Sequence, residues 1–359
     1  MSVYQPQGMK VATGSPTQMK VPRLRASVWI EAPIDVVALV TDRPSGAHVM
    51  RPQKITDAAG VLDDISILST LKLDPAHPVK GRSAKWSSPL HAPFLTQARD
   101  QCHAAGIQLL AGYALADADG AGAVKIFLQW IRQQGTVASL TDHADDLLDF
   151  LDAQGFRDLD GLSFDIELNA LNANDAPAFT TFYRYLAGKL AARNQILAVA
   201  TGTGLPPGPA AALGTFNAQP FDMALGSPNF IIRPMAYDAF GVSDADFLQW
   251  QADVVDYALN TLGLPPSQFQ LGLKTSNNVT PIPRPKKWPP PGWSARACCF
   301  DAGGVADRCQ LVLRPRNVGV ITFAGWIDHK AVDAKLNPNL SPSNRVGEPL
   351  QVPLTAVLS

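Results

Sequence analysis

Alternation between short apolar runs and longer amphipathic stretches constrains the fold of this chain more than any other feature. Short runs rich in β-branched and aromatic residues predict strands. Eight such runs occur, at residues 25–31, 64–71, 107–115, 159–167, 196–201, 230–237, 269–275 and 318–326. Helical spacing of apolar residues predicts helices between most of them, at 88–105, 124–134, 142–154, 177–193 and 243–262.

Strands that alternate with helices favour a parallel sheet, and eight such units favour a closed (β/α)8 TIM barrel, an α/β fold. An open doubly wound sheet is the alternative, but no Gly-x-Gly-x-x-Gly follows an early strand. The length of 359 residues and the hydrophobic content of 46% suit one such domain. We therefore expect a flexible lead at 1–24, a barrel at 25–336 and a surface tail at 337–359.

Charge and hydropathy argue against two classes of partner. The formal net charge of −1 provides no overall field for nucleic acid or for an anionic membrane. No run of about 18 apolar residues exists, so the sequence predicts no transmembrane helix. Residues 1–27 lack the continuous apolar core of a secretory signal. We expect a monomer without nucleic-acid or membrane partners.

The four cysteines predict neither a metal site nor a cofactor. Cys102 falls in the predicted helix 88–105, where it indicates a core thiol. Cys298, Cys299 and Cys309 fall in a Pro-rich stretch, 277–317, that we expect to be an irregular loop between the last two strands. Cys299 and Cys309 could close a small disulfide ring, and the spacing lacks the paired Cys-x-x-Cys form of a zinc site.

The stretch 159–167 carries the strongest signal for chemistry. Side chains alternate along a strand, so Ser163, Asp165 and Glu167 share one face while the other face is apolar. Two carboxylates on one face of an apolar strand are costly to bury unless they are paired or take part in a reaction. A solvated strand end and a satisfied carboxylate pair are the structural alternatives.

The same stretch resembles the Asp-Gly-x-Asp-x-Asp-x-Glu signature of family-18 glycoside hydrolases, the chitinase family. Asp160, Gly161, Asp165 and Glu167 match, and Ser163 replaces the first strand-facing Asp. The resemblance extends to Met235-Ala236-Tyr237-Asp238 on the sixth predicted strand and to Trp326, which closes the eighth.

The resemblance implies an enzyme in which the substrate's own N-acetyl group is the nucleophile. It assigns Glu167 as general acid and later general base. It assigns Asp165 to the acetamide N–H and the oxazolinium intermediate. The remaining positions would bind the sugar: Tyr237 at the acetamide oxygen, Met235 and Asp238 along the pocket, and Trp326 as its apolar floor.

Ser163 is the departure from the family pattern. The family's inner Asp shares a proton with the second Asp, and a Ser on the third strand usually supports it. We expect Ala111 at that supporting position. Because a hydroxyl can still hydrogen-bond Asp165 and because Glu167 is intact, we interpret the chain as an active enzyme.

The resemblance leaves the substrate open. The leading hypothesis is a retaining endo-glycosidase that hydrolyses β-1,4 bonds next to N-acetylglucosamine in chitin-type oligosaccharides or polysaccharides. The stretch 277–317 lacks the alternating strands of a separate α+β insertion, which predicts an open groove. The alternatives are an endo-β-N-acetylglucosaminidase acting on N-glycan cores, a peptidoglycan-type substrate and a non-catalytic sugar-binding protein. The family favours secretion, although no signal peptide is visible.

Overall fold

The computed structural model describes residues 24–31, 62–116, 119–134, 138–168, 170–171, 173–202, 226–237, 244–275 and 302–324. Most of the predicted lead at 1–24, the tail at 337–359 and the first part of the stretch 277–317 lie outside these residues.

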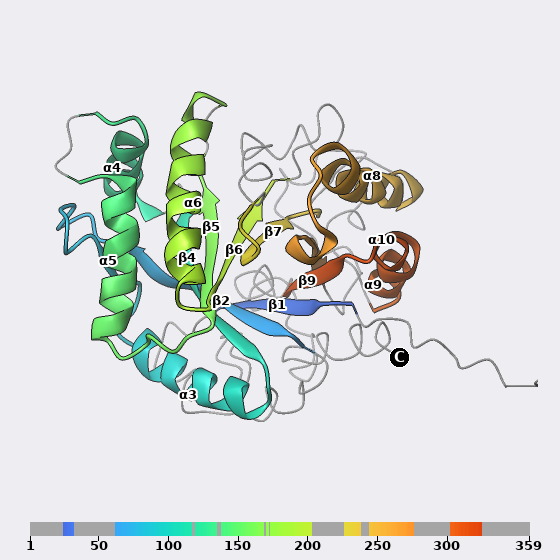
Figure 1. The fold of residues 1–359 in the computed structure, drawn as a ribbon, viewed down its shortest axis with the longest axis horizontal. Coiled ribbons are helices and arrows are strands. Elements are labelled where there is room, and N and C mark those ends of the chain that lie inside the picture. Colours follow the sequence, from blue (N-terminus) through green and yellow to red (C-terminus); the bar gives the residue numbers. More distant parts are fainter. Residues whose placement is uncertain are drawn as a thin grey trace, which may run out of the picture.

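The fold is a nearly closed barrel of parallel strands (Figure 1). Within the described residues, eight strands run in the order β7-β6-β5-β4-β2-β1-β9-β8, and two isolated bridges join β7 to β8. The short strand β3 (Ala84–Trp86) pairs antiparallel with the end of β2. The parallel strands are β1 (Ala26–Glu31), β2 (Asp64–Leu73), β4 (Gln108–Ala116), β5 (Gly161–Glu167), β6 (Ile196–Thr201), β7 (Phe230–Pro234), β8 (Gln270–Thr275) and β9 (Gly319–Ala324). All eight predicted strands are therefore confirmed, as is the barrel.

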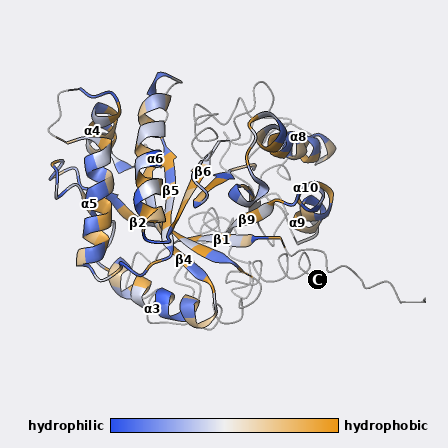
Figure 2. Ribbon diagram, viewed as in Figure 1, coloured by the Kyte–Doolittle hydropathy of each residue, from blue (hydrophilic) through white to orange (hydrophobic). Residues whose placement is uncertain are grey.

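Helices surround the strands (Figure 1). Figure 2 shows hydrophobic and hydrophilic residues mixed along each helix, as expected for helices with one face on the core. The helices are α3 (His91–Ala104), α4 (Ala121–Ile131), α5 (Leu140–Ala153), α6 (Ala176–Ala191), α8 (Asp244–Asp256), α9 (Ala302–Arg308) and α10 (Arg314–Arg316). The shorter segments are the 3-10 turns η2 (Ala173–Asp175) and η5 (Pro266–Gln268) and the π-helical segments η4 (Tyr257–Thr261) and η7 (Cys309–Leu313).

The prediction of an irregular loop over 277–317 is wrong for the last part of that stretch. Residues 302–316 form a helical unit, α9, η7 and α10. Val305, Cys309, Val312 and Leu313 bury one side of this unit, a helical spacing that Gly303, Gly304 and Pro315 obscure in the sequence. Cys309 is a buried free thiol, so the proposed Cys299–Cys309 ring is not formed. Cys102 is also free and buried in α3, as predicted.

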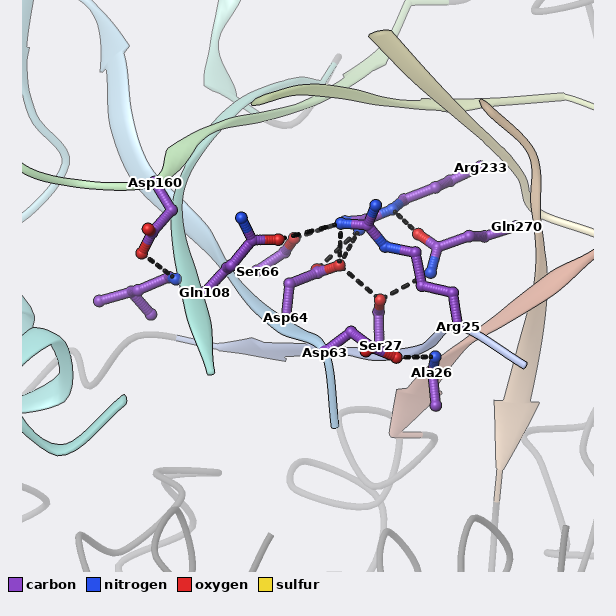
Figure 3. Close-up of polar contacts among 11 residues, drawn as sticks. Arg25, Ala26, Ser27, Asp63, Asp64, Ser66, Gln108, Asp160, Arg233 and Gln270 are labelled. Carbon is purple, nitrogen blue, oxygen red and sulfur yellow. Dashed lines mark hydrogen bonds and ion pairs between the residues drawn. The ribbon is translucent and has the colours of Figure 1, made fainter. Parts of the chain in front are cut away.

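Buried charge occupies the amino-terminal end of the barrel interior (Figure 3). Arg233 on β7 donates to both carboxylate oxygens of Asp64 on β2, at 2.6 and 2.8 Å, and both side chains are fully buried. Burial alone would raise the pKa of Asp64, but Arg233, Arg25 and a hydrogen bond from Ser27 outweigh it and lower that pKa. Gln270 accepts from Arg233 at 2.7 Å. This network ties strands from both halves of the chain together near the amino termini of β1, β2 and β8, which the long side chain of Arg233 reaches from β7.

Asp160 and Gly161, the first two residues of the signature at 160–167, have structural roles. The Asp160 carboxylate accepts from the Leu109 amide at 2.8 Å and contacts His103 Nε2 at 2.9 Å. A Cβ on Gly161 would lie 2.1 Å from the carbonyl oxygen of Ile196, so only glycine fits there. Both residues fix the start of β5 between its neighbours and lie at the opposite end from Glu167.

None of the described helices combines the length and the apolar composition that crossing a membrane requires.

Candidate active site

The side chains of β5 alternate as the sequence predicts. Leu162, Phe164 and Ile166 pack into the core between barrel and helices, where Phe164 meets the ring of Phe182 at a centroid distance of 5.7 Å. Ser163, Asp165 and Glu167 occupy the other face, and their exposure rises along the strand, from buried through partly buried to exposed. The two carboxyl groups therefore lie at the carboxyl-terminal mouth of the barrel, where enzymes of this fold place their active sites.

Small residues on β4 flank this face. Gly112, Ala114 and Ala116 are in register with Ser163, Asp165 and Glu167, in that order. Residues in register on parallel strands point to the same side, so the three β4 side chains level with Ser163, Asp165 and Glu167 are all small. The prediction that Ala111 occupies the place beside Ser163 is wrong. Ala111 is in register with Leu162 and packs into the outer core.

Gly112 is required by an irregularity in the neighbouring strand. The β2–β4 register shifts between Ile67 and Leu71. A Cβ on Gly112 would lie 2.2 Å from the carbonyl oxygen of Ile67, closer than any real contact. Thr70 in the shifted segment donates its hydroxyl to the Gly112 carbonyl at 2.9 Å. The bulge therefore presses β2 against β4 where Ser163 lies, and bulges of this kind are common beside active sites.

Two polar atoms on the β5 face have no partner. Ser163 Oγ and Asp165 Oδ1 are both buried and make no hydrogen bond within the part of the chain that the structure describes. The Ser163–Asp165 hydrogen bond that the sequence permits is therefore not formed. An unsatisfied buried polar group costs roughly 1–3 kcal/mol, and native proteins rarely carry one without a ligand or a function to explain it.

The two carboxyl groups influence one another's ionisation. Burial of Asp165, together with the negative charge of Glu167, raises the pKa of Asp165 to about 8. Interacting carboxyl groups titrate as a pair rather than as separate sites. Near neutral pH the Asp165 carboxyl group of the ligand-free protein therefore holds a proton.

The residues after β7 lie at the same end of the barrel. Tyr237 is buried, and with the partly buried Met235 it packs in one cluster with Trp29, Ala200 and other apolar side chains. Ala200 follows Ala198, the β6 register partner of Ser163, by two residues on the same strand face. The cluster therefore borders the β5 face. Asp238 and Trp326, also predicted for the site, lie outside the described residues.

Trp29 is a residue of this end of the barrel that the sequence interpretation missed. It lies on β1, is 2% exposed and packs in the cluster that contains Tyr237. A Cβ on Gly272 of β8 would lie 3.1 Å from its ring, so the glycine leaves room for the indole. The only signal in the sequence is its position two residues after Ser27 on a predicted strand, which many core residues share.

A second buried polar cluster contains a serine, a histidine and an aspartate. Ser83 Oγ contacts both Asp146 and His143 Nδ1, the latter at 2.8 Å, and His143 Nε2 contacts the Tyr113 hydroxyl at 3.1 Å. In a hydrolytic triad the histidine stands between the other two, whereas here the serine does. Because all four side chains are buried, the cluster fixes the β2–β3 hairpin on α5. Within the described residues no group of three or more His, Cys, Asp or Glu could hold a metal ion.

Comparison with known proteins is informative at the level of three-dimensional structure. No family model matches the sequence, and no curated protein matches it. A class V chitinase from Pseudomonas fluorescens Pf-5 superposes with a TM-score of 0.60 at 15% identity, covering 94% of this chain and all of that one. A chitinase from Chromobacterium violaceum gives 0.56 at 12% identity, covering 94% and 98% of the two chains.

A third similar structure was determined with a sugar bound. It is a mutant of catalytic domain 2 of the Group II chitinase of Ostrinia furnacalis, in complex with an N-acetylglucosamine oligosaccharide, (NAG)5. Its TM-score is 0.56 at 14% identity, covering 84% of this chain and 90% of that one. These likenesses agree with the resemblance of the β5 signature. The chain has the (β/α)8 barrel fold of these chitinases.

Proposed function

We propose that the protein is a retaining glycoside hydrolase of the chitinase type, cutting β-1,4 bonds next to N-acetylglucosamine in chitin-type chains. The observation that carries this proposal is the β5 face at the barrel mouth. It presents an exposed Glu167 beside a partly buried Asp165 whose Oδ1 has no partner. The chitinase fold of the whole chain supports the same assignment.

The proton held by the carboxyl pair suits substrate-assisted hydrolysis. An acetamide N–H placed against Asp165 would donate to its unpartnered oxygen and stabilise the carboxylate form. The shared proton would then reside on Glu167, which is exposed to the glycosidic oxygen that must be protonated. The acetamide oxygen would attack the anomeric carbon as the leaving group departs, and Tyr237 would hold that oxygen in place. Glu167, now deprotonated, would activate the water that opens the oxazolinium.

The test compares three substrates by mass spectrometry: chitin oligomers, a high-mannose glycopeptide and peptidoglycan fragments. We expect cleavage of the chitin oligomers. Glu167→Gln should lower turnover by several orders of magnitude, because the leaving group is no longer protonated, while oligosaccharide binding persists. Asp100→Asn, which alters an exposed carboxylate on α3, should leave turnover unchanged.

Each other outcome changes the proposal in a defined way. Cleavage of the glycopeptide or of peptidoglycan alone would keep the reaction and replace the substrate. Binding of oligosaccharide without cleavage of any substrate would identify a sugar-binding protein. A Glu167→Gln variant with more than about a tenth of the original rate would remove Glu167 from the reaction.

A further inference from the structure

The segment that follows β7 is held by three different neighbours in succession. Pairing with β6 ends at Pro234, opposite Thr201. The Met235 amide donates to the Thr201 carbonyl at 2.7 Å, and the Ala236 amide donates to the Gly272 carbonyl of β8 at 3.1 Å. The Ala236 carbonyl accepts from a side chain, Nε2 of Gln251 on α8, at 2.7 Å. The Ala236 carbonyl belongs to the peptide unit that joins Ala236 to Tyr237. Among these hydrogen bonds, the one to this peptide unit is donated by a helix side chain rather than by a strand.

Gln251 is well placed to fix that peptide unit. Its side chain is fully buried, and Arg308 on α9 donates to its other end, Oε1, at 3.2 Å. A cation at the amide oxygen polarises the amide and makes its N–H groups better donors. Arg308 is itself held, because its guanidinium lies over the ring of Phe247 at 5.9 Å and donates to the Gly304 carbonyl.

We infer that Gln251 is a positioning residue for Tyr237: it anchors the Ala236–Tyr237 peptide and thereby places the phenol against the substrate's acetamide. The carbonyl of Ala236 and the amide nitrogen of Tyr237 belong to one planar unit, so fixing the carbonyl fixes the direction in which Tyr237 leaves the chain. This inference rests on the proposed role of Tyr237. A displacement of about 1 Å in a group that orients a reacting atom can cost up to about 100-fold in rate.

Two variants separate the two ends of the Gln251 amide. Gln251→Met keeps the volume and removes both hydrogen bonds, whereas Gln251→Glu keeps the acceptor for Arg308 and loses the donor to Ala236. The matched control is Gln268→Met. Gln268 is also buried and donates to backbone carbonyls, including that of Phe230 at 3.1 Å, but at the start of β7, the end remote from Tyr237.

The kinetic readout is kcat and KM on a chromogenic N-acetylglucosaminide. Gln251→Met and Gln251→Glu should each lower kcat by on the order of tenfold with a smaller change in KM, and Gln268→Met should lower neither. In a Tyr237→Phe background, Gln251→Met should cost less than in the original protein, because the hydroxyl that it positions is gone. Losses that add fully, or a Gln268→Met loss of equal size, would overturn the inference.

A second readout does not depend on catalysis. The chain has six tyrosines, so the fluorine NMR spectrum of 3-fluorotyrosine-labelled protein should identify Tyr237 as the resonance missing from Tyr237→Phe. That resonance should shift or broaden in both Gln251 variants and stay in place in Gln268→Met. If it does not respond, Gln251 does not position Tyr237. If it responds and no N-acetylated substrate is cleaved by the original protein, the proposed function fails while the positioning stands.

Discussion

Asp165 and Ser163 are the residues at which the candidate site differs most from a satisfied protein interior. Both carry buried polar atoms without partners, and they lie on one strand face beside small residues of β4. A sugar with an acetamide group offers a donor and an acceptor at such a place. If the proposed sugar binds there, the ionisation of Asp165 should differ between the ligand-free and the bound protein.

The raised pKa of Asp165 predicts how stability depends on pH. The folded protein holds the proton up to about pH 8, whereas the unfolded chain releases it near the ordinary value of 3.8. The contribution of Asp165 is therefore most favourable below about pH 4 and is lost as pH rises toward 8. Asp165→Asn, which cannot ionise, should gain free energy of unfolding relative to the original protein between pH 5 and pH 8.

Urea unfolding of both proteins at the two pH values measures this difference. Asp100→Asn, an exposed carboxylate variant, should follow the original protein at both. A difference between Asp165→Asn and the original protein that does not change with pH would mean that Asp165 titrates normally in the folded state.

At the scale of secondary-structure elements, the contact between β2 and β4 determines the space beside the carboxyl groups. The bulge after Ile67 leaves no room for any side chain at residue 112. Gly112→Ala should lower the free energy of unfolding by about 1–3 kcal/mol, because backbone rather than a flexible side chain must move. It should also lower activity, since Ser163 lies in register beside it.

Chemical denaturation together with the rate on an N-acetylglucosaminide checks this expectation. The control is Gly188→Ala on an exposed position of α6, where an added Cβ meets nothing within 4 Å. That change should be neutral or stabilise by roughly 0.5–1 kcal/mol. Equal effects of the two substitutions would mean that the bulge can relax.

The elements show what a single sequence can and cannot predict. The eight strands were predictable because buried parallel strands are continuous apolar runs bounded by turn residues. That Ser163, Asp165 and Glu167 share one face of β5 followed from the two-residue period of a strand alone. The partner of Ser163 did not, because register depends on pairing between distant segments and a slip of one residue exchanges Ala111 for Gly112.

Two elements escaped prediction for other reasons. β3 has three residues and exists only because the end of β2 provides an edge for it. The helical unit at 302–316 carries two glycines and a proline, which in isolation favour a loop, and its burial against α8 overrides that preference. In both cases tertiary packing supplies the stability that local sequence lacks.

Within the described residues, the barrel interior holds different polar groups at its two ends. The amino-terminal end holds the hydrogen-bonded ion pair of Arg233 and Asp64 (Figure 3). The carboxyl-terminal mouth holds the Asp165 carboxyl group, whose Oδ1 has no hydrogen-bond partner among the described residues. The Arg233–Asp64 pair joins positions 169 residues apart, so no local pattern could have indicated it. The division agrees with the rule that this fold keeps stability at one end and function at the other.

Arg233→Met tests that division. It leaves the buried charge of Asp64 without its main partner, so it should lower the free energy of unfolding by about 3–5 kcal/mol. Arg233→Met combined with Asp64→Leu should regain a large part of the loss, because no uncompensated charge remains. Thermal unfolding of the three proteins measures both effects. A double variant as unstable as the single one would show that shape, rather than charge, makes the pair important.

The two bridges between β7 and β8 are the sparsest pairing between neighbouring parallel strands in the described barrel. The other neighbouring parallel strands described pair over at least four consecutive positions, whereas these two are bridged at Ile232–Phe269 and Met235–Gly272 alone. We expect a barrel with one sparsely paired join between strands to open first at that join. Amide protons along the join should then exchange with solvent at the lowest energetic cost. Tyr237 stands just beyond this join. Local opening at this join would therefore disturb the neighbourhood of Tyr237 while the other barrel strands stay paired.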